Sequence, residues 1–443
     1  MRILSQRGAV LIQVGLGMIA LMALSALAID YGVKMAARRA AQNAADAGAL
    51  AGAIALSFDD PDDKSDTGPA KQSALKFALA NAVWGESPDV NVSTDITFPT
   101  CPPPTEPDTC IRVDVFRNQA RGNPLPTFFG NLVGISDQGV RATATARVVA
   151  GDTTECLKPW VVVDRWDEFE GAETDWDKPG GDPDFIWPGD SMPTSTYDKY
   201  SDGKGQNPPA ENDLYVPPSS TSPGTGFTPA LDFGKRFAIK TPSPSDPVSS
   251  GWVQSVDLPR VDTTNGGAAA YEENIRTCNG WPTSLAKPEV PCPTDPNTIG
   301  SWEEKIFWAQ RGCLRVQTGV AQGPTTDGIE FIMAKDPSAY WDGTKVVSTF
   351  SPSPRIVPIG VFDIDQYLAM NPTGSGGIVR LVNIFGFFIE GMGDVDKNTG
   401  LITCCSKGGK AVVGRLINLP ALMTGTSTLD PESSFLKTIV LVR

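Results

Sequence analysis

The sequence predicts an α+β protein in three parts: a long N-terminal transmembrane helix, a small α+β domain, and a larger, mainly β domain that is exported. Three observations lead to this prediction. An uncharged apolar run stands near the N-terminus, and an Ala-rich helical segment follows it without a break. Most later segments are short, alternate in polarity and lie between turns, in keeping with the 44 glycines and 38 prolines of the 443-residue chain.

The apolar run Gly8–Ile29 carries no charge and exceeds the roughly 20 residues that a helix needs to cross a bilayer. Arg2 and Arg7 precede it and Asp30 ends it, so the positive-inside rule places the N-terminus in the cytoplasm and the rest outside. A cleaved signal peptide is the alternative, because Ala26–Ala28 resembles a cleavage site, although the run is longer than the usual apolar region of about 7–15 residues. We expect a single-pass inner-membrane protein whose bulk is periplasmic or exported.

Residues 36–52 read AARRAAQNAADAGALAG. At about 100° per residue, charged residues gather on one arc of the helix, and a stripe on the opposite side consists only of small residues. The residues of this stripe are Ala36, Ala40, Ala44, Gly48 and Gly52. A face without bulk lets a second helix approach closely, so we expect these residues to be a helix-packing surface for a partner. The alternative is a plain Ala-rich spacer, because Ala is the best helix former.

After a charged hinge at 58–69, the small domain is expected to end near residue 150. Its predicted elements are a helix at 71–83, strands at 90–98, 111–116 and 138–149, and a short helix at 126–134. The larger domain is predicted to have helices at 266–278 and 325–337 and strands at 356–364, 377–390, 410–419 and 435–443. The expected parts are therefore 1–57, 58–150 and 151–443.

Eight cysteines on an exported chain predict disulfides. Two pairs bracket short Pro-containing segments and are candidates for local bridges: Cys101 with Cys110, and Cys278 with Cys292. The adjacent Cys404 and Cys405 are expected to pair with different partners. Eight cysteines allow 105 full pairings, so the remaining connectivity stays open.

A calcium site is one interpretation of residues 394–400, DVDKNTG, which place Asp394, Asp396 and Asn398 at alternate positions. The match to a calcium loop is incomplete, because Gly400 comes one place late and Cys405 stands where the loop needs Glu. Such clusters are more often plain turns. Apart from calcium at these residues, no cofactor is expected.

Composition excludes several function classes. The net charge of −14 argues against a nucleic-acid partner, and the absence of histidine removes His-dependent catalysis and His-ligated metals. No nucleophile elbow, phosphate loop or dinucleotide motif is present. Asp164, Asp167, Glu168 and Glu170 lie near Trp166 in a pattern that can line a carbohydrate site, but such a run is more often a solvated loop anchored by tryptophan. We expect no enzyme activity.

The stretch RGAVLIQVGLGMIALMALSALAIDYGVKMAARRAAQNAADAGALAGA, residues 7–53, resembles the N-terminal segment of TadG-like (TadE/TadG-related) proteins of the Tad (Flp) pilus-assembly system. Its distinctive part is Asp30-Tyr31-Gly32 followed by the Ala-rich run. CLKPWVVVDRW at 156–166 and the C-terminal strands also look like the longer members. The resemblance implies a pilin-like design, in which the first half of a long helix lies in the membrane and the second half lies under a globular domain. It also implies other Tad pilus-assembly proteins and the inner membrane as partners.

Two departures from the family limit what the resemblance implies. If Gly8 were the processing glycine, the fifth mature residue would be Gln13 where prepilins carry Glu, so we expect the N-terminus to be retained. No Asp-x-Ser-x-Ser pentapeptide occurs, so neither a von Willebrand A domain nor its Mg²⁺ site is expected. The leading function is a membrane-anchored structural component of a Tad/Flp-type pilus or secretion apparatus. The alternative is an exported binding module or adhesin, stabilised by calcium.

Overall fold

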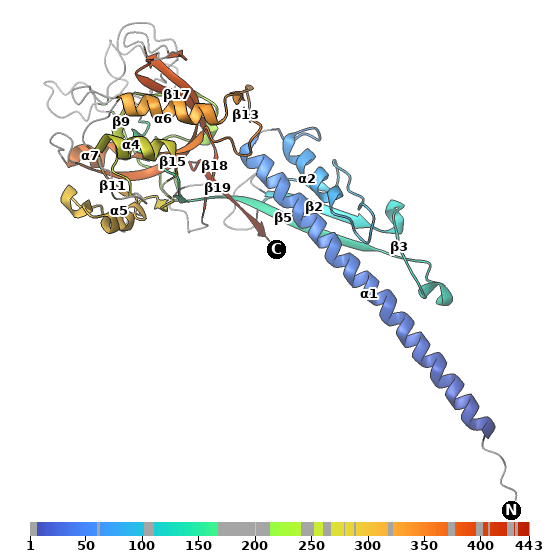
Figure 1. The fold of residues 1–443 in the computed structure, drawn as a ribbon. Coiled ribbons are helices and arrows are strands. Elements are labelled where there is room, and N and C mark those ends of the chain that lie inside the picture. The colour runs from blue at the N-terminus through green and yellow to red at the C-terminus, as the bar shows by residue number, and fades with distance from the viewer. Residues whose placement is uncertain are drawn as a thin grey trace, which may run out of the picture. The chain divides into compact units, whose positions relative to one another are not determined.

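The computed structural model (Figure 1) describes residues 7–59, 63–101, 110–166, 200, 213–240, 252–259, 267–278, 280–287, 289–317, 322–370, 377–395, 402–405, 408–422, 429 and 433–442. The chain divides into two compact units. The first unit contains residues 1–148 and 439–443, and the second contains residues 149–438. The expected parts 1–57 and 58–150 thus lie in one unit except for residues 149 and 150, and the C-terminal residues 439–443 also belong to it.

The N-terminal helix α1 runs unbroken from Arg7 to Phe58 (Figure 1). Its C-terminal half packs on α2 (Pro69–Ala80) and on strand β2 (Cys110–Arg117). The buried residues of this half of α1 are almost all small: Ala37, Ala41, Ala44, Ala45, Gly48, Ala49, Ala51, Gly52, Ala53 and Ala55. The buried face of α2 is small as well, with Ala70, Ala74 and Ala78. The two helices therefore meet through backbone and methyl groups.

Glycine is required where α1 crosses α2 and β2. A Cβ added at Gly52 would lie 2.5 Å from Cδ1 of Ile111 and 3.0 Å from Cβ of Ala74, and one at Gly48 would lie 3.0 Å from Cβ of Ala78. The stripe predicted from the sequence is thus filled here from within the chain. The expectation that this face receives another protein is wrong for Gly48 and Gly52, because α2 and β2 already occupy the space.

The sheet of the first unit has the order β1 (Ile96–Thr97), β2, β5 (Val140–Ala150) and β19 (Leu436–Val442), and β2 and β5 are antiparallel from Cys110↔Arg147 to Arg117↔Val140. In β5 the alternation of VRATATARVV turns Ala142, Ala144 and Ala146 into the core with the Ala residues of α1. The outward residues are polar. A short pair, β3 (Leu125–Pro126) with β4 (Asp137–Gln138), encloses the 3₁₀ turn η2 (Gly130–Val133), and η1 covers Gln119–Arg121.

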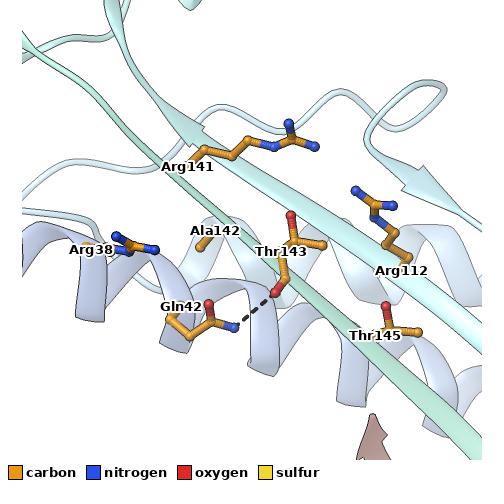
Figure 2. A pocket seen from close by; sticks show the side chains of 7 residues that line it. All are labelled: Arg38, Gln42, Arg112, Arg141, Ala142, Thr143 and Thr145. Carbon is orange, nitrogen blue, oxygen red and sulfur yellow. Dashed lines mark hydrogen bonds between the residues drawn. The ribbon is translucent and has the colours of Figure 1, made fainter. Parts of the chain in front are cut away.

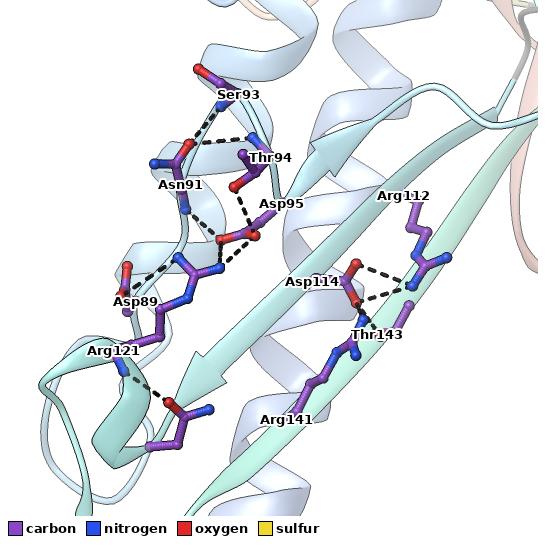
Figure 3. A network of polar contacts seen from close by, with 11 residues as sticks. Asp89, Asn91, Ser93, Thr94, Asp95, Arg112, Asp114, Arg121, Arg141 and Thr143 are labelled. Carbon is purple, nitrogen blue, oxygen red and sulfur yellow. Dashed lines mark hydrogen bonds and ion pairs between the residues drawn. The ribbon is translucent and has the colours of Figure 1, made fainter.

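Two predicted elements of the first unit are shorter than expected. Only Ile96–Thr97 of the predicted strand 90–98 forms a strand, because the preceding residues make a turn around a carboxylate: Asp95 accepts the backbone N–H of Asn91 at 2.8 Å and the guanidinium of Arg121 at 2.7 Å (Figure 3). Side chains that satisfy the backbone locally compete with a strand ladder. The predicted helix at 126–134 is limited to η2.

The second unit combines helices with a sheet of order β8-β17-β15-β14-β7-β9, to which β11 and β16 add by pairing with β15. Among the described residues its strands are β6 (Thr153–Thr154), β7 (Trp160–Val163), β8 (Arg236–Lys240), β9 (Val253–Ser255), β10 (Thr283–Ser284), β11 (Cys313–Arg315), β12 (Tyr340–Trp341), β13 (Val346–Val347), β14 (Ile356–Phe362), β15 (Ile378–Val395), β16 (Ile402–Cys404), β17 (Ala411–Ile417) and β18 (Leu419–Pro420). Its helices are α3 (Pro229–Asp232), α4 (Gly267–Arg276), η3 (Pro296–Ile299), α5 (Trp302–Ala309), α6 (Gln322–Lys335) and α7 (Ile364–Ala369).

Strand β15 is central to this sheet, with β14 and β17 as antiparallel neighbours. Nearly every residue of β15 is buried, which explains its continuous apolar sequence, and α6 packs on it and on α4. Phe385 and Phe387 belong to the core of the second unit, where Phe385 makes edge-on contacts with Phe227 and Phe435. Helix α6 begins at Gln322, three residues before the predicted start.

Four disulfides connect the cysteines. Cys101 is bonded to Cys110 across a Cα–Cα distance of 5.5 Å. The predicted pairing of Cys278 with Cys292 is wrong, because the fold places each beside another cysteine: Cys156 pairs with Cys278, and Cys292 with Cys313. The expectation of different partners for Cys404 and Cys405 is also wrong, since they are bonded to each other.

The acidic residue that follows β7 lies in the core. Asp164 has no exposed surface, so the expectation of a solvated loop is wrong at this position. Its carboxylate accepts backbone N–H groups of Arg165 and Phe227 at 2.9 Å and the hydroxyl of Tyr215 at 3.1 Å. Burial outweighs these donors and raises the pKa of Asp164 to about 7, and burial also raises the pKa of Asp232 to about 6. Asp167, Glu168 and Glu170 lie outside the described residues.

We expect Gly52→Leu to destabilise the first unit by about 1–3 kcal/mol, because bulk is forced against Ile111 and Ala74. The better helix propensity of Leu would offset at most about 1 kcal/mol. The effect is measured by urea unfolding of the full chain in detergent, with the protection of α2 backbone amides from hydrogen exchange as the readout. Ala36→Leu is the control, since Ala36 is an exposed member of the same stripe. Equal protection in both variants would contradict the packing.

We expect the second unit to lose stability as pH rises from about 5 to 7. The folded state binds a proton at Asp164 more tightly than the unfolded chain does, so the stability present at low pH falls by about 1.4 kcal/mol per pH unit until the pH reaches the folded pKa. Lys158, whose pKa burial lowers to about 7, opposes this trend only above that pH. Thermal melting across the range should show a flatter profile for Asp164→Asn and an unchanged one for Asp327→Asn, an exposed control.

Candidate functional site

The N-terminal half of α1 is covered by no other part of the described chain. Its large apolar side chains are exposed, from 46% at Ile29 to 76% at Leu11. Among the described residues, α1 is the one helix long and apolar enough to cross a membrane, judged by length and composition, with a mean hydropathy of 2.2 in its most apolar part. The polar and Ala-rich half that follows is the part that packs on the first unit.

Asp30 lies at the end of the exposed apolar half and is bonded to a distant loop. Its Oδ1 accepts the N–H of Phe128 at 2.8 Å, and its Oδ2 accepts the N–H groups of Phe129 at 3.1 Å and Gly130 at 2.7 Å. Desolvation raises the pKa of the Asp30 carboxyl, but the three N–H donors outweigh it and hold the pKa below its ordinary value. The ionised carboxylate thus caps the start of η2.

This loop is closed by its own bonds. The hydroxyl of Thr127 donates to the carbonyl of Ile135 at 2.8 Å, and the N–H of Ile135 donates to the carbonyl of Gly130 at 2.9 Å. A Cβ at Gly130 would lie 2.9 Å from the Ile135 carbonyl oxygen, so the turn needs glycine. Phe128, Phe129 and Ile135 remain 56%, 38% and 55% exposed.

An open pocket of about 570 Å³ lies between α1 and strands β2 and β5. Figure 2 shows the side chains that line it: Arg38, Gln42, Arg112, Arg141, Ala142, Thr143 and Thr145. Gln42 donates to the carbonyl of Thr143 at 3.1 Å and to Asp46 at 2.8 Å, which fixes α1 against β5.

Two of the three arginines that line the pocket share one carboxylate (Figure 3). Asp114 pairs with Arg112 at 3.1 Å and with Arg141 at 3.0 Å, and it accepts the hydroxyl of Thr143. Desolvation raises the pKa of Asp114, but these donors outweigh it and the pKa is lowered overall. One carboxylate offsets only one of these two positive charges, so together with Arg38 the arginines of the pocket keep an excess of positive charge.

The residues predicted as sites are placed as follows. Gly48, Gly52 and Ala44 are buried in the first unit, Ala40 is half-buried and Ala36 is exposed. Asp394 accepts the backbone N–H of Lys410 at 3.0 Å, whereas Asp396 and Asn398 lie outside the described residues. Within the part of the chain that the structure describes, no three Cys, Asp or Glu side chains gather in a way that could hold a metal ion.

Sequence reasoning missed the link between Asp30 and η2. Residues 98 to 100 positions apart meet there, and no local pattern predicts such a contact. One signal was available: PTFFGNLVG places two phenylalanines and a glycine in a stretch too short for a buried helix.

The comparisons with known proteins agree with the N-terminal geometry. Residues 8–55 match the family model described as "Putative Flp pilus-assembly TadE/G-like". No curated protein and no solved structure matches the chain. The matched range covers the exposed apolar half of α1, Asp30, and the Ala-rich half that packs on α2 and β2. The chain therefore carries, in residues 8–55, a TadE/G-like Flp pilus-assembly segment, which confirms the family resemblance predicted from its sequence.

Proposed function

We propose that this protein is a membrane-anchored, non-enzymatic structural component of a Tad/Flp-type pilus assembly or secretion apparatus. The TadE/G-like segment supports a pilus-assembly role. The observation that carries the finer proposal is the division of one continuous helix into an exposed apolar half and a packed Ala-rich half. Such a helix holds a globular unit at a fixed distance from a bilayer, as an anchor and support.

The apolar half suits a lipid environment in three respects. Every backbone N–H and C=O of its interior is satisfied within the helix, as the hydrocarbon core requires. The one side-chain hydroxyl bond there is internal too, from Ser25 to the carbonyl of Leu21 at 2.8 Å. Tyr31, exposed by 60%, follows Asp30 at the expected interface, where aromatic side chains are enriched.

Disulfides suit an exported location. Cys101–Cys110 stands in the first unit, and Cys156–Cys278 and Cys292–Cys313 stand in the second. Such bonds persist in the oxidising periplasm and are rare in the cytosol. We therefore propose that the N-terminus is cytoplasmic and that both units are periplasmic or exported, with other Tad pilus-assembly proteins as partners.

An alkaline-phosphatase fusion after Ala150 should be active, because this reporter folds only after export. A fusion after Arg7 should be inactive, since the arginines at 2 and 7 retain the N-terminus inside. Activity measured on intact cells, with equal expression confirmed by immunoblot, decides the topology. An inactive and stable fusion after Ala150 would contradict it.

Deletion of this protein in its own organism should abolish Flp-type surface filaments, counted by electron microscopy. The full chain should restore them. A matched variant in which residues 1–29 are replaced by a cleavable signal peptide should be exported but should not restore them, because the anchor is lost.

Normal filaments in the deletion strain would contradict the pilus-assembly role and favour the alternative of an exported binding module or adhesin. If the variant with the cleavable signal peptide restored the filaments, the need for the membrane anchor would be contradicted, but the pilus-assembly role would not. Fractionation accompanies both measurements, because the proposal places the full chain in the inner-membrane fraction and the cleaved variant among soluble periplasmic proteins.

A further inference from the structure

The loop bonded to Asp30 carries an exposed apolar cluster and has no charged residue in its own sequence. Residues 122–136 contain no Asp, Glu, Lys or Arg, between Arg121 and Asp137. Phe128, Phe129 and Ile135 stand out from this stretch with 38–56% of their surface exposed. Exposed apolar groups on a loop tip mark a surface that binds protein or lipid.

The position of the cluster identifies the occupant. Three backbone N–H groups of the loop, those of residues 128–130, donate hydrogen bonds to Asp30. Asp30 is the residue at which the exposed apolar half of α1 ends. The backbone of Phe128 and Phe129 is therefore held at the level of Asp30, whose neighbours on α1 include the exposed apolar residues Ile29 and Tyr31.

The backbone of the loop is prepared for an interface of low polarity. The N–H groups of residues 128–130 are taken by Asp30, that of Ile135 by Gly130, and the carbonyl of Ile135 by Thr127. Backbone groups left unpaired there would cost free energy on leaving water, whereas paired ones do not. The paired groups therefore need no water partner when the loop meets such an interface.

We propose that residues 127–135 form a second membrane contact, in which Phe128, Phe129 and Ile135 enter the interfacial layer of the outer leaflet of the inner membrane, held at that depth by Asp30. This inference rests on the proposed membrane anchoring. Its consequence is mechanical: a single helix leaves the first unit free to rotate and tilt about its axis, while a second contact beside the helix restricts both motions.

Photo-crosslinking tests this contact in the full chain, reconstituted in vesicles of phosphatidylethanolamine and phosphatidylglycerol. p-Benzoylphenylalanine is placed singly at Phe128, at Leu21 in the apolar half of α1, and at Phe77. Phe77 is the matched control, because it is 47% exposed but lies on α2, beside Ala78, which packs on Gly48. Gly48 is 18 residues beyond Asp30 along α1, or about 27 Å at 1.5 Å per residue.

We expect lipid adducts, detected by mass spectrometry, at positions 128 and 21 and their absence at 77. Adducts at 21 without adducts at 128 would overturn the loop contact and leave the anchoring intact. Absence at both would overturn the anchoring and this inference with it. Crosslinks from 128 to a second copy of the chain would overturn the lipid contact in favour of self-association.

The role of Asp30 is tested by Asp30→Asn in the same preparations. The amide offers one acceptor oxygen where the carboxylate offers two, so the start of η2 should be released. The lipid adduct at 128 should be lost while that at 21 is retained, and unchanged hydrogen exchange in α2 should show that the first unit is folded. An unchanged adduct at 128 would overturn the positioning role of Asp30.

Discussion

The close approach of α1 to α2, β2 and β5 is the constraint on which the first unit depends. Three elements present Ala or Gly at the contact: Gly48 and Gly52 on α1, Ala74 and Ala78 on α2, and alternate residues of β5. Each small side chain buries little area, so the stabilisation comes from many close contacts between backbones and methyl groups. Such packing leaves no room for added bulk at Gly48 and Gly52.

The two halves of α1, before and after Asp30, have different surroundings. Before this residue α1 exposes Leu, Ile, Met and Val, and after it the buried face consists mostly of Ala and Gly. The small residues suit the close approach of protein backbones, and the large ones suit the proposed membrane anchoring, because lipid chains adapt to large side chains. Asp30 lies between the two halves and connects α1, through hydrogen bonds from Phe128 and Gly130, to the segment between β3 and β4.

The second unit is stabilised by different means. Its core contains large aromatic and branched side chains around β15, and several polar groups in it are paired, as with Asp164 and Tyr215 or with Arg355, which donates to the carbonyls of Ala339 and Ile389. Two disulfides join cysteines that are 122 and 21 residues apart in the sequence. The family match ends at residue 55, so the role of this unit within the proposed apparatus rests on its attachment to the anchored helix.

The sequence by itself determined the elements whose pattern is local. The apolar run, the continuous helix to Phe58, and the strands at 111–116, 356–364 and 410–419 could be predicted, because side-chain period and length decide them within a few residues. The TadE/G-like segment could also be recognised, since its signature lies in one continuous stretch.

Only the tertiary structure decided which surfaces meet. The Ala-Gly stripe predicts close packing but carries no information on the partner, and the partner turned out to be α2 and β2 of the same chain. Cys278 lies nearer in sequence to Cys292 than to Cys156, yet the fold places it beside Cys156. Asp164 reads as part of an acidic, solvated run, but it follows a buried strand and is enclosed with it. Asp30 meets Phe128 for the same reason: contacts across about a hundred residues depend on chain topology, which no local spacing encodes.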